Sequence, residues 1–171
     1  MTTERDELRR RLDGATAGLD PPLAAVDLAA FDANGAALAA RAAGRPLRVA
    51  SKSVRCRLLL RRVLATPGWR GVLAYTLAEA NWLAATGVAD DVLVGYPTVD
   101  RAALAALAVD ADLAAAVTLM VDDEAQLDLV DAVVPPAARP ALRVCLDLDA
   151  SWRPLAGRAH GGVRRSPVHS P

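Results

Sequence analysis

The sequence predicts an α/β fold built on parallel strands, namely a partial (β/α)8 barrel of the TIM type with about five barrel strands present. Short apolar runs rich in Val and Leu alternate with longer stretches whose apolar residues recur at helical spacing. No Gly-x-Gly-x-x-Gly element follows any of the apolar runs, which disfavours a dinucleotide-binding sheet. The pattern alone does not distinguish an open doubly wound sheet from a (β/α)8 barrel.

The beginning of the chain, residues 1–19, is expected to be a polar helix followed by a linker. Residues 3–12 are rich in charged side chains, and Asp20-Pro21-Pro22 comes next as a strong helix breaker. A short strand is expected at residues 23–26. Asp27 then provides the N-cap of a helix with apolar residues at helical spacing.

From residue 47 onward, apolar strands and amphipathic helices alternate regularly. This alternation is typical of parallel strands joined by helical crossovers. The predicted strands cover residues 47–51, 71–77, 91–96, 117–121 and 142–148, and the predicted helices cover about 55–66, 78–86, 100–114 and 123–133.

Residues 20–171 are therefore assigned to one barrel that is incomplete at its C-terminal end. A full barrel usually needs about 200 residues or more, whereas five strands are predicted before Pro171. We expect the chain to be a fragment of a longer protein, with unpaired strand edges.

Composition and charge exclude several classes of protein. A hydrophobic content of 53% in 171 residues allows a substantial core, and the formal net charge is +0. The arginines are spread along the chain, so no nucleic-acid-binding surface is expected. No apolar run has the length of a signal-peptide core or a membrane span, which favours a cytoplasmic protein without membrane contact. Cys56 and Cys145 are expected to be reduced packing residues.

Lys52 is the only lysine among 20 basic residues, and it ends the first strand of the alternating series. Alternation along this strand directs Val49 and Ser51 toward the helices, and Ala50 and Lys52 toward the inside of the barrel. Barrel enzymes place working residues at the C-terminal ends of strands. Because partial desolvation favours the neutral, nucleophilic form of an amine, Lys52 is the candidate Schiff-base former. The alternative is a surface lysine in an arginine-biased sequence.

Asp147 and Asp149 are weaker site candidates at the end of the last predicted strand. Both belong to the set that alternation directs inward, where carboxylates can take part in chemistry. The alternative interpretation is structural, with each carboxylate paired to a nearby arginine such as Arg143 or Arg153. We favour structural pairing for these two residues.

Four further residues carry less weight as site candidates. Tyr75 and Tyr96 follow strand ends and can reach a site at the barrel mouth, although a buried ring with a solvated hydroxyl is the commoner arrangement. His160 and His169 occupy the final loop, and without a third nearby ligand they do not form a metal site.

Three segments resemble the N-terminal half of the fold-type III pyridoxal-phosphate enzymes, which belong to the alanine racemase N-terminal-domain superfamily. The segments are residues 22–34 (PLAAVDLAAFDAN), 48–53 (RVASKS) and 147–149 (DLD). Within this superfamily the opening segment, with its Val-Asp-Leu and Asn34, is most similar to the branch of D-threonine aldolase and D-serine dehydratase. The resemblance covers nearly everything from residue 20 to the end.

The resemblance implies that Lys52 holds pyridoxal 5'-phosphate as an internal aldimine and that Arg158 lies near the phenolic oxygen of this cofactor, with Arg153 as the competing arginine. It implies an amino-acid substrate and a lyase of aldolase or dehydratase type, or a racemase, acting on D-amino acids or β-hydroxy amino acids. Ligands for a divalent metal would lie outside this chain. The 171-residue piece by itself can lack activity, and a homodimer of the complete protein stays open.

Two other functions remain open at this point. The first is a noncatalytic carrier of pyridoxal phosphate, similar to the single-barrel homeostasis proteins whose lysine also follows a Val-Ser-Lys-like strand. The second is a cofactor-free class I aldolase, in which Lys52 forms a Schiff base directly with a sugar or keto-acid carbonyl.

Overall fold

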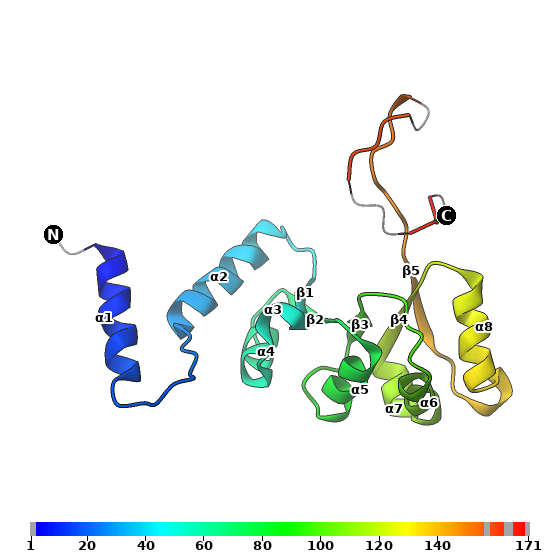
Figure 1. The fold of residues 1–171 in the computed structure, drawn as a ribbon, viewed down its shortest axis with the longest axis horizontal. Helices are drawn as coiled ribbons and strands as arrows, with labels where there is room; N and C mark the ends of the chain where they lie inside the picture. The colour runs from blue at the N-terminus through cyan, green and yellow to red at the C-terminus, as the bar shows by residue number, and fades with distance from the viewer. Residues whose placement is uncertain (1–2, 156–157, 163–165, 170–171) are drawn as a thin grey trace. The chain divides into compact units, whose positions relative to one another are not determined.

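The computed structural model describes residues 3–155, 158–162 and 166–169, and it divides the chain into two compact units, Met1–Gly44 and Arg45–Pro171 (Figure 1). The first unit contains two helices. The second contains a parallel sheet with its connecting helices. The division into residues 1–19 and 20–171 stays a prediction.

The first unit consists of α1 (Glu4–Thr16) and α2 (Leu28–Arg41). A capping box begins α1, because Thr3 Oγ1 accepts the Asp6 N–H at 3.3 Å and the Asp6 carboxylate accepts the Thr3 N–H at 3.1 Å. The helix extends four residues past the predicted end at residue 12. Asp27 caps α2 by accepting a backbone N–H from its first turn, as predicted.

The strand predicted at residues 23–26 is wrong. These residues form no strand in the structure, and Leu23 and Val26 are 45% and 50% exposed. A strand exists only where its backbone groups can pair with a neighbour. A four-residue apolar run shows β propensity but carries no information about an available partner.

The second unit is built on five parallel strands that pair in the order of the sequence, β1-β2-β3-β4-β5. A doubly wound sheet reverses its strand order at a switch point, and this sheet does not. The observed order is that of a barrel, so the structure confirms a partial TIM-like barrel. The strands are β1 (Leu47–Ala50), β2 (Trp69–Ala74), β3 (Val92–Val94), β4 (Val117–Val121) and β5 (Arg143–Leu146).

Helical segments connect the strands. The predicted helix at residues 100–114 is divided into two, and a short helix that the sequence did not predict precedes the helix expected at residues 55–66. Arg55 adopts a left-handed conformation with φ 48° and ends the first short helix. Asp110 has an extended backbone and caps the following helix by accepting the N–H groups of Asp112 and Leu113. Among the described residues, no helix has both the length and the apolar character needed to cross a membrane. The segments are α3 (Ser51–Val54), α4 (Arg57–Leu64), α5 (Leu77–Ala85), α6 (Arg101–Val109), α7 (Ala111–Ala116), α8 (Glu124–Val133) and the 3-10 helix η1 (Pro136–Ala138).

The core lies on one face of the sheet. Because crossovers between parallel strands are right-handed, a sheet wound in sequence order receives all of its helices on the same side. Side chains directed to that side are buried almost completely, among them Val72, Val92 and Val117 at no more than 1% exposure. On the opposite face, Leu73 and Leu93 pair in register and are half-buried. Alternation along the strands therefore separates a covered outer face from an open inner face, as predicted.

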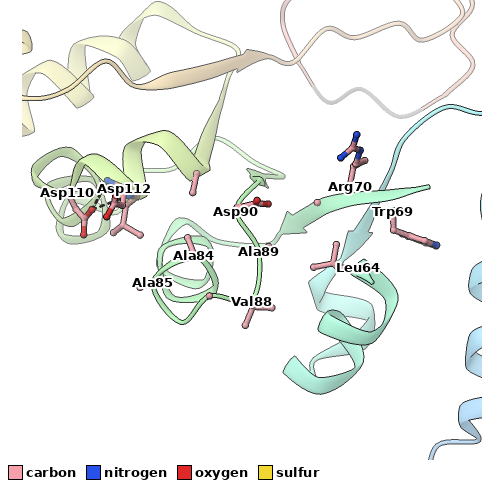
Figure 2. Close-up of a pocket in the computed structure, with 14 residues that line it drawn as sticks. Leu64, Trp69, Arg70, Ala84, Ala85, Val88, Ala89, Asp90, Asp110 and Asp112 are labelled. Carbon is pink, nitrogen blue, oxygen red and sulfur yellow. Dashed lines mark hydrogen bonds between the residues drawn. The ribbon is translucent and has the colours of Figure 1, made fainter. Parts of the chain in front are cut away.

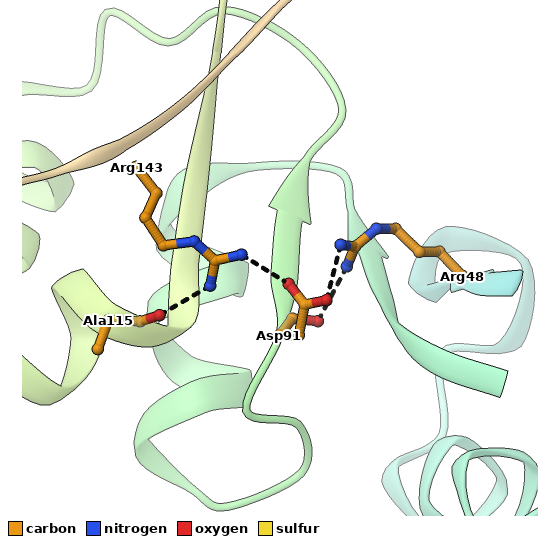
Figure 3. A network of polar contacts seen from close by, with 4 residues as sticks. All are labelled: Arg48, Asp91, Ala115 and Arg143. Carbon is orange, nitrogen blue, oxygen red and sulfur yellow. Dashed lines mark hydrogen bonds and ion pairs between the residues drawn. The ribbon is translucent and has the colours of Figure 1, made fainter. Parts of the chain in front are cut away.

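A polar network crosses the inner face near the N-terminal ends of the strands (Figure 3). The Asp91 carboxylate accepts a hydrogen bond from Arg48 at 2.7 Å and another from Arg143 at 3.3 Å. Arg48 also donates to the Asp91 carbonyl, and Arg143 donates to the Ala115 carbonyl at 2.8 Å. One carboxylate thus connects β1 with β5 across the sheet.

Gly71 in β2 leaves the space through which the Arg48 side chain reaches Asp91. A Cβ atom at this position would lie 2.5 Å from Arg48 Nη1 and 2.5 Å from the Asp91 carbonyl oxygen. Both distances are far below van der Waals contact, and the carbonyl belongs to backbone that cannot rotate away. Any larger residue at position 71 must displace the network.

We predict that Gly71→Ala lowers the free energy of unfolding by about 1–3 kcal/mol, the usual cost of overpacking a filled site. Urea unfolding followed by circular dichroism measures the change. Gly14→Ala is the control, because a Cβ there has no heavy atom within 4 Å and alanine favours the helix. Equal unfolding midpoints for Gly71→Ala and the unsubstituted chain would contradict the assigned role of Gly71.

Candidate functional site

Side chains from three neighbouring strands meet at the C-terminal edge of the sheet. Lys52 follows β1, Tyr75 comes directly after β2, and Tyr96 lies two residues beyond β3. Parallel strands present their C-terminal ends at one edge, so residues far apart in sequence become neighbours there. The Tyr75 and Tyr96 rings lie 5.5 Å apart with an interplanar angle of 81°, an edge-to-face arrangement.

Lys52 occupies the first turn of α3 and not the strand itself. Since β1 ends at Ala50, the alternation that directs Lys52 inward does not extend to it. Its side chain is exposed, in contrast to the shielded amine expected from the sequence. The Nζ atom lies 5.7 Å from the centre of the Tyr75 ring, within range of a cation–π interaction. The amine is therefore placed at the rim of the sheet and is accessible.

The backbone on both sides of Lys52 is held in place. Ser51 is fully buried, and its hydroxyl donates to the Leu73 carbonyl of β2 at 3.3 Å. The Arg55 N–H bonds the Ser51 carbonyl at 2.8 Å, and Arg55 Nε donates to the Lys52 carbonyl at 3.2 Å. These bonds fix the turn that carries the amine.

A groove with a volume of about 340 Å³ lies beside the amine, and we call it the lysine groove. Leu60 of α4 and Leu83 of α5 provide apolar walls, and both are buried. Cys56, which also lines the groove, and Cys145 are free thiols, as expected. The residues that line the lysine groove are Lys52, Arg55, Cys56, Arg57, Leu60, Tyr75, Thr76, Glu79, Trp82 and Leu83.

Glu79 positions Tyr75 at the edge of this groove. Its carboxylate accepts the Tyr75 N–H at 2.9 Å, while its own N–H donates to Thr76 Oγ1 at 3.2 Å, so that both residues cap α5. Sequence reasoning does not identify Glu79 or Trp82 as site residues. The Thr-x-x-Glu spacing after a strand is the sequence signal that points to Glu79.

The last strand leads into a loop that holds the other predicted site residues. β5 ends at Leu146, so Asp147 and Asp149 lie beyond it. Asp149 is buried and accepts the Ser151 N–H at 2.9 Å and a hydrogen bond from Arg153 at 2.6 Å. Hydrogen bonds from the Ser151 hydroxyl and N–H, together with the Arg153 guanidinium, lower the pKa of Asp149 to about 2. The interpretation of Asp149 as a structural partner of Arg153 fits this geometry.

Arg158 lies in the same loop and is exposed. Its backbone N–H bonds the Leu155 carbonyl at 3.2 Å. No contact within the described part of the chain joins Arg153 or Arg158 to Lys52, so the assignment of either arginine to a cofactor stays a prediction. Over the same residues, no group of three His, Cys, Asp or Glu side chains is arranged to hold a metal ion.

A larger hollow of about 760 Å³ lies at the opposite edge of the sheet (Figure 2). It is lined by Arg70 at the start of β2, by Asp90 before β3, and by Asp110 and Asp112 at the start of α7. Barrel enzymes carry out chemistry at the C-terminal ends of their strands, whereas the N-terminal ends serve stability. Size alone therefore does not make this hollow the site, and the lysine groove remains the candidate.

No family model and no curated protein matches the sequence. The structure is similar to the solved structure of D-threonine aldolase from Filomicrobium marinum, with a TM-score of 0.60 and 28% sequence identity. The match covers 74% of this chain and 33% of the aldolase chain, so the protein described here spans about a third of that enzyme. The similarity confirms the α/β barrel-like fold and indicates an enzyme as relative.

The ordered loop around Asp149 should be sensitive to acid. The pKa of Asp149 is lowered from 3.8 to about 2 in the folded loop, so its contribution to stability is present above about pH 4 and is lost as the pH falls toward 2. NMR of the Trp152 amide, which bonds the Gly161 carbonyl at 2.9 Å, follows the loop during an acid titration. Asp149→Asn should abolish the transition and Asp147→Asn should keep it. An unchanged transition in Asp149→Asn would refute the assignment.

Proposed function

We propose that this chain forms part of a pyridoxal-phosphate-dependent enzyme that acts on D-amino acids or β-hydroxy amino acids. Retro-aldol cleavage, deamination and racemisation are the reactions proposed, and the similarity to a D-threonine aldolase favours the first. The observation that carries the proposal is the position of Lys52. The only lysine of the sequence lies at the C-terminal rim of a barrel-like parallel sheet, where enzymes of this architecture act.

The lysine groove fits the proposed cofactor. An aldehyde needs an accessible amine, and Lys52 is exposed at the groove. The volume of about 340 Å³ falls within the range of roughly 300–1,000 Å³ usual for small-molecule sites. Tyr75 adds an aromatic ring beside the amine, against which a pyridine ring can stack. These features support the cofactor without depending on the resemblance of short motifs.

When bound, pyridoxal phosphate delocalises the electron pair left behind when a bond to the α-carbon of an amino acid breaks. The protein supplies the position and the proton transfer. Lys52 Nζ is the group that would hold the aldehyde of the cofactor, and as a free amine it would carry a proton to or from the α-carbon of the substrate. The Tyr75 ring limits where this nitrogen can lie.

The remaining contacts to the cofactor are part of the proposal. Arg153 is engaged by Asp149 at 2.6 Å, whereas the Arg158 side chain pairs with no carboxylate among the described residues. This difference supports Arg158 as the arginine beside the phenolic oxygen. A divalent metal would take its ligands from outside this chain, and the substrate is a small molecule of the amino-acid class.

Borohydride reduction of the chain after incubation with pyridoxal phosphate tests the proposal directly. We expect a stable cofactor adduct on the peptide that contains Lys52, located by mass spectrometry. Lys52→Arg keeps the charge and should lose the adduct. The N-terminal amine is the internal reference for nonspecific labelling. An adduct only at the N-terminus, or equal labelling of Lys52→Arg, would refute the role of Lys52.

Tyr75 should increase the yield of this adduct by providing a ring against which the pyridine ring of the cofactor stacks. Replacing the ring by Tyr75→Ala removes an aromatic contact worth about 0.5–1.5 kcal/mol, so the labelling of Lys52 at low cofactor concentration should fall about two- to tenfold. Tyr75→Phe keeps the ring and should label normally. A loss of labelling in both variants would instead assign the effect to the tyrosine hydroxyl.

A further inference from the structure

The lysine groove carries more positive charge than its single carboxylate balances. Lys52, Arg55 and Arg57 all line it, and Glu79 is the only acidic residue among the lining residues. The Glu79 carboxylate already accepts the Tyr75 N–H at 2.9 Å. Three cations that face a small cavity with apolar walls favour an anionic ligand.

The two guanidinium groups are held in place and keep donors available. Arg57 lies over the Trp82 ring at 5.0 Å, an arrangement that leaves the N–H groups at the edge of the guanidinium plane able to donate. Arg55 donates through Nε to the Lys52 carbonyl at 3.2 Å. This bond fixes the side chain and leaves the two terminal nitrogens of the guanidinium available to donate to a ligand. In the described residues, neither arginine forms an ion pair with a carboxylate.

We propose that Arg55 and Arg57 bind the carboxylate of the amino-acid substrate. The inference rests on the proposed function, because that function brings the substrate's amino group to Lys52 and its α-carboxylate only two bonds further away. Planar guanidinium groups match the geometry of a carboxylate and can bind it through two parallel hydrogen bonds. The lysine groove then selects amino acids with a free carboxylate and orients them for reaction at the α-carbon.

The single lysine makes the binding step measurable without catalysis. Reductive methylation with 13C-formaldehyde labels Lys52 and the N-terminal amine of the full 171-residue chain, and NMR resolves the two signals. Titration with D-threonine should shift the Lys52 signal and saturate. D-threonine amide, which lacks the carboxylate, should bind at least about tenfold more weakly, because a hydrogen-bonded charge pair is lost.

Two variants and one control assign this effect to the arginines. Arg57→Gln and Arg55→Asn should each weaken D-threonine binding at least about tenfold, and asparagine tolerates the left-handed backbone at position 55. Arg70→Gln makes the same charge change at the opposite edge of the sheet and should leave binding unchanged. Circular dichroism checks that each variant is folded. Absence of a saturable shift, equal binding of the amide, or normal binding by both variants would overturn the proposal.

Labelling with the cofactor separates this inference from the proposed function. If Arg57→Gln is labelled normally by pyridoxal phosphate but binds D-threonine weakly, both proposals stand. If D-threonine binds through the arginines and Lys52 is never labelled, only the proposed function fails. If Arg57→Gln loses labelling by pyridoxal phosphate but not by pyridoxal, the groove holds the cofactor phosphate, and the carboxylate assignment is wrong.

Discussion

Pairing of the five parallel strands in sequence order is the constraint on which the rest of the structure depends. Right-handed crossovers then place every connecting helix on the same face, and they bring every strand's C-terminal end to one edge. Valines buried against the helices, such as Val72, Val92 and Val117, stabilise this arrangement by removing apolar surface from water. The lysine groove exists because this edge gathers residues from consecutive βα connections.

The two ends of the sheet have different roles. Near the N-terminal ends, Asp91 is hydrogen-bonded by Arg48 and Arg143, so its charge is compensated and Gly71 provides the necessary space. At the C-terminal edge, Lys52 lies over an aromatic ring and its positive charge is not paired with a carboxylate among the described residues. Compensated charges stabilise a fold, whereas accessible, uncompensated ones can bind a ligand.

The similarity to a D-threonine aldolase and the geometry of the lysine groove support the same function by independent routes. The first concerns the path of the backbone over 74% of the chain, and the second concerns side chains at one edge. The lysine groove contains no residue of the loop around Asp149, where hydrogen bonds from Ser151 and Arg153 already account for the buried carboxylate. Fold and site are therefore both compatible with the amine chemistry proposed for Lys52.

The sequence by itself determined the five strands and their parallel arrangement, and it made Lys52 the candidate, because period-2 burial and a unique residue type are local properties of a chain. It did not determine that residues 23–26 lack a partner strand, or that β1 ends at Ala50 and leaves Lys52 exposed in a helical turn. Only the tertiary structure decided that Tyr75 lies beside this amine and that Glu79 and Arg57 line the same groove. Tyr75 and Glu79 belong to the next βα connection, and their approach to Lys52 depends on how the connections turn, which side-chain periodicity does not encode.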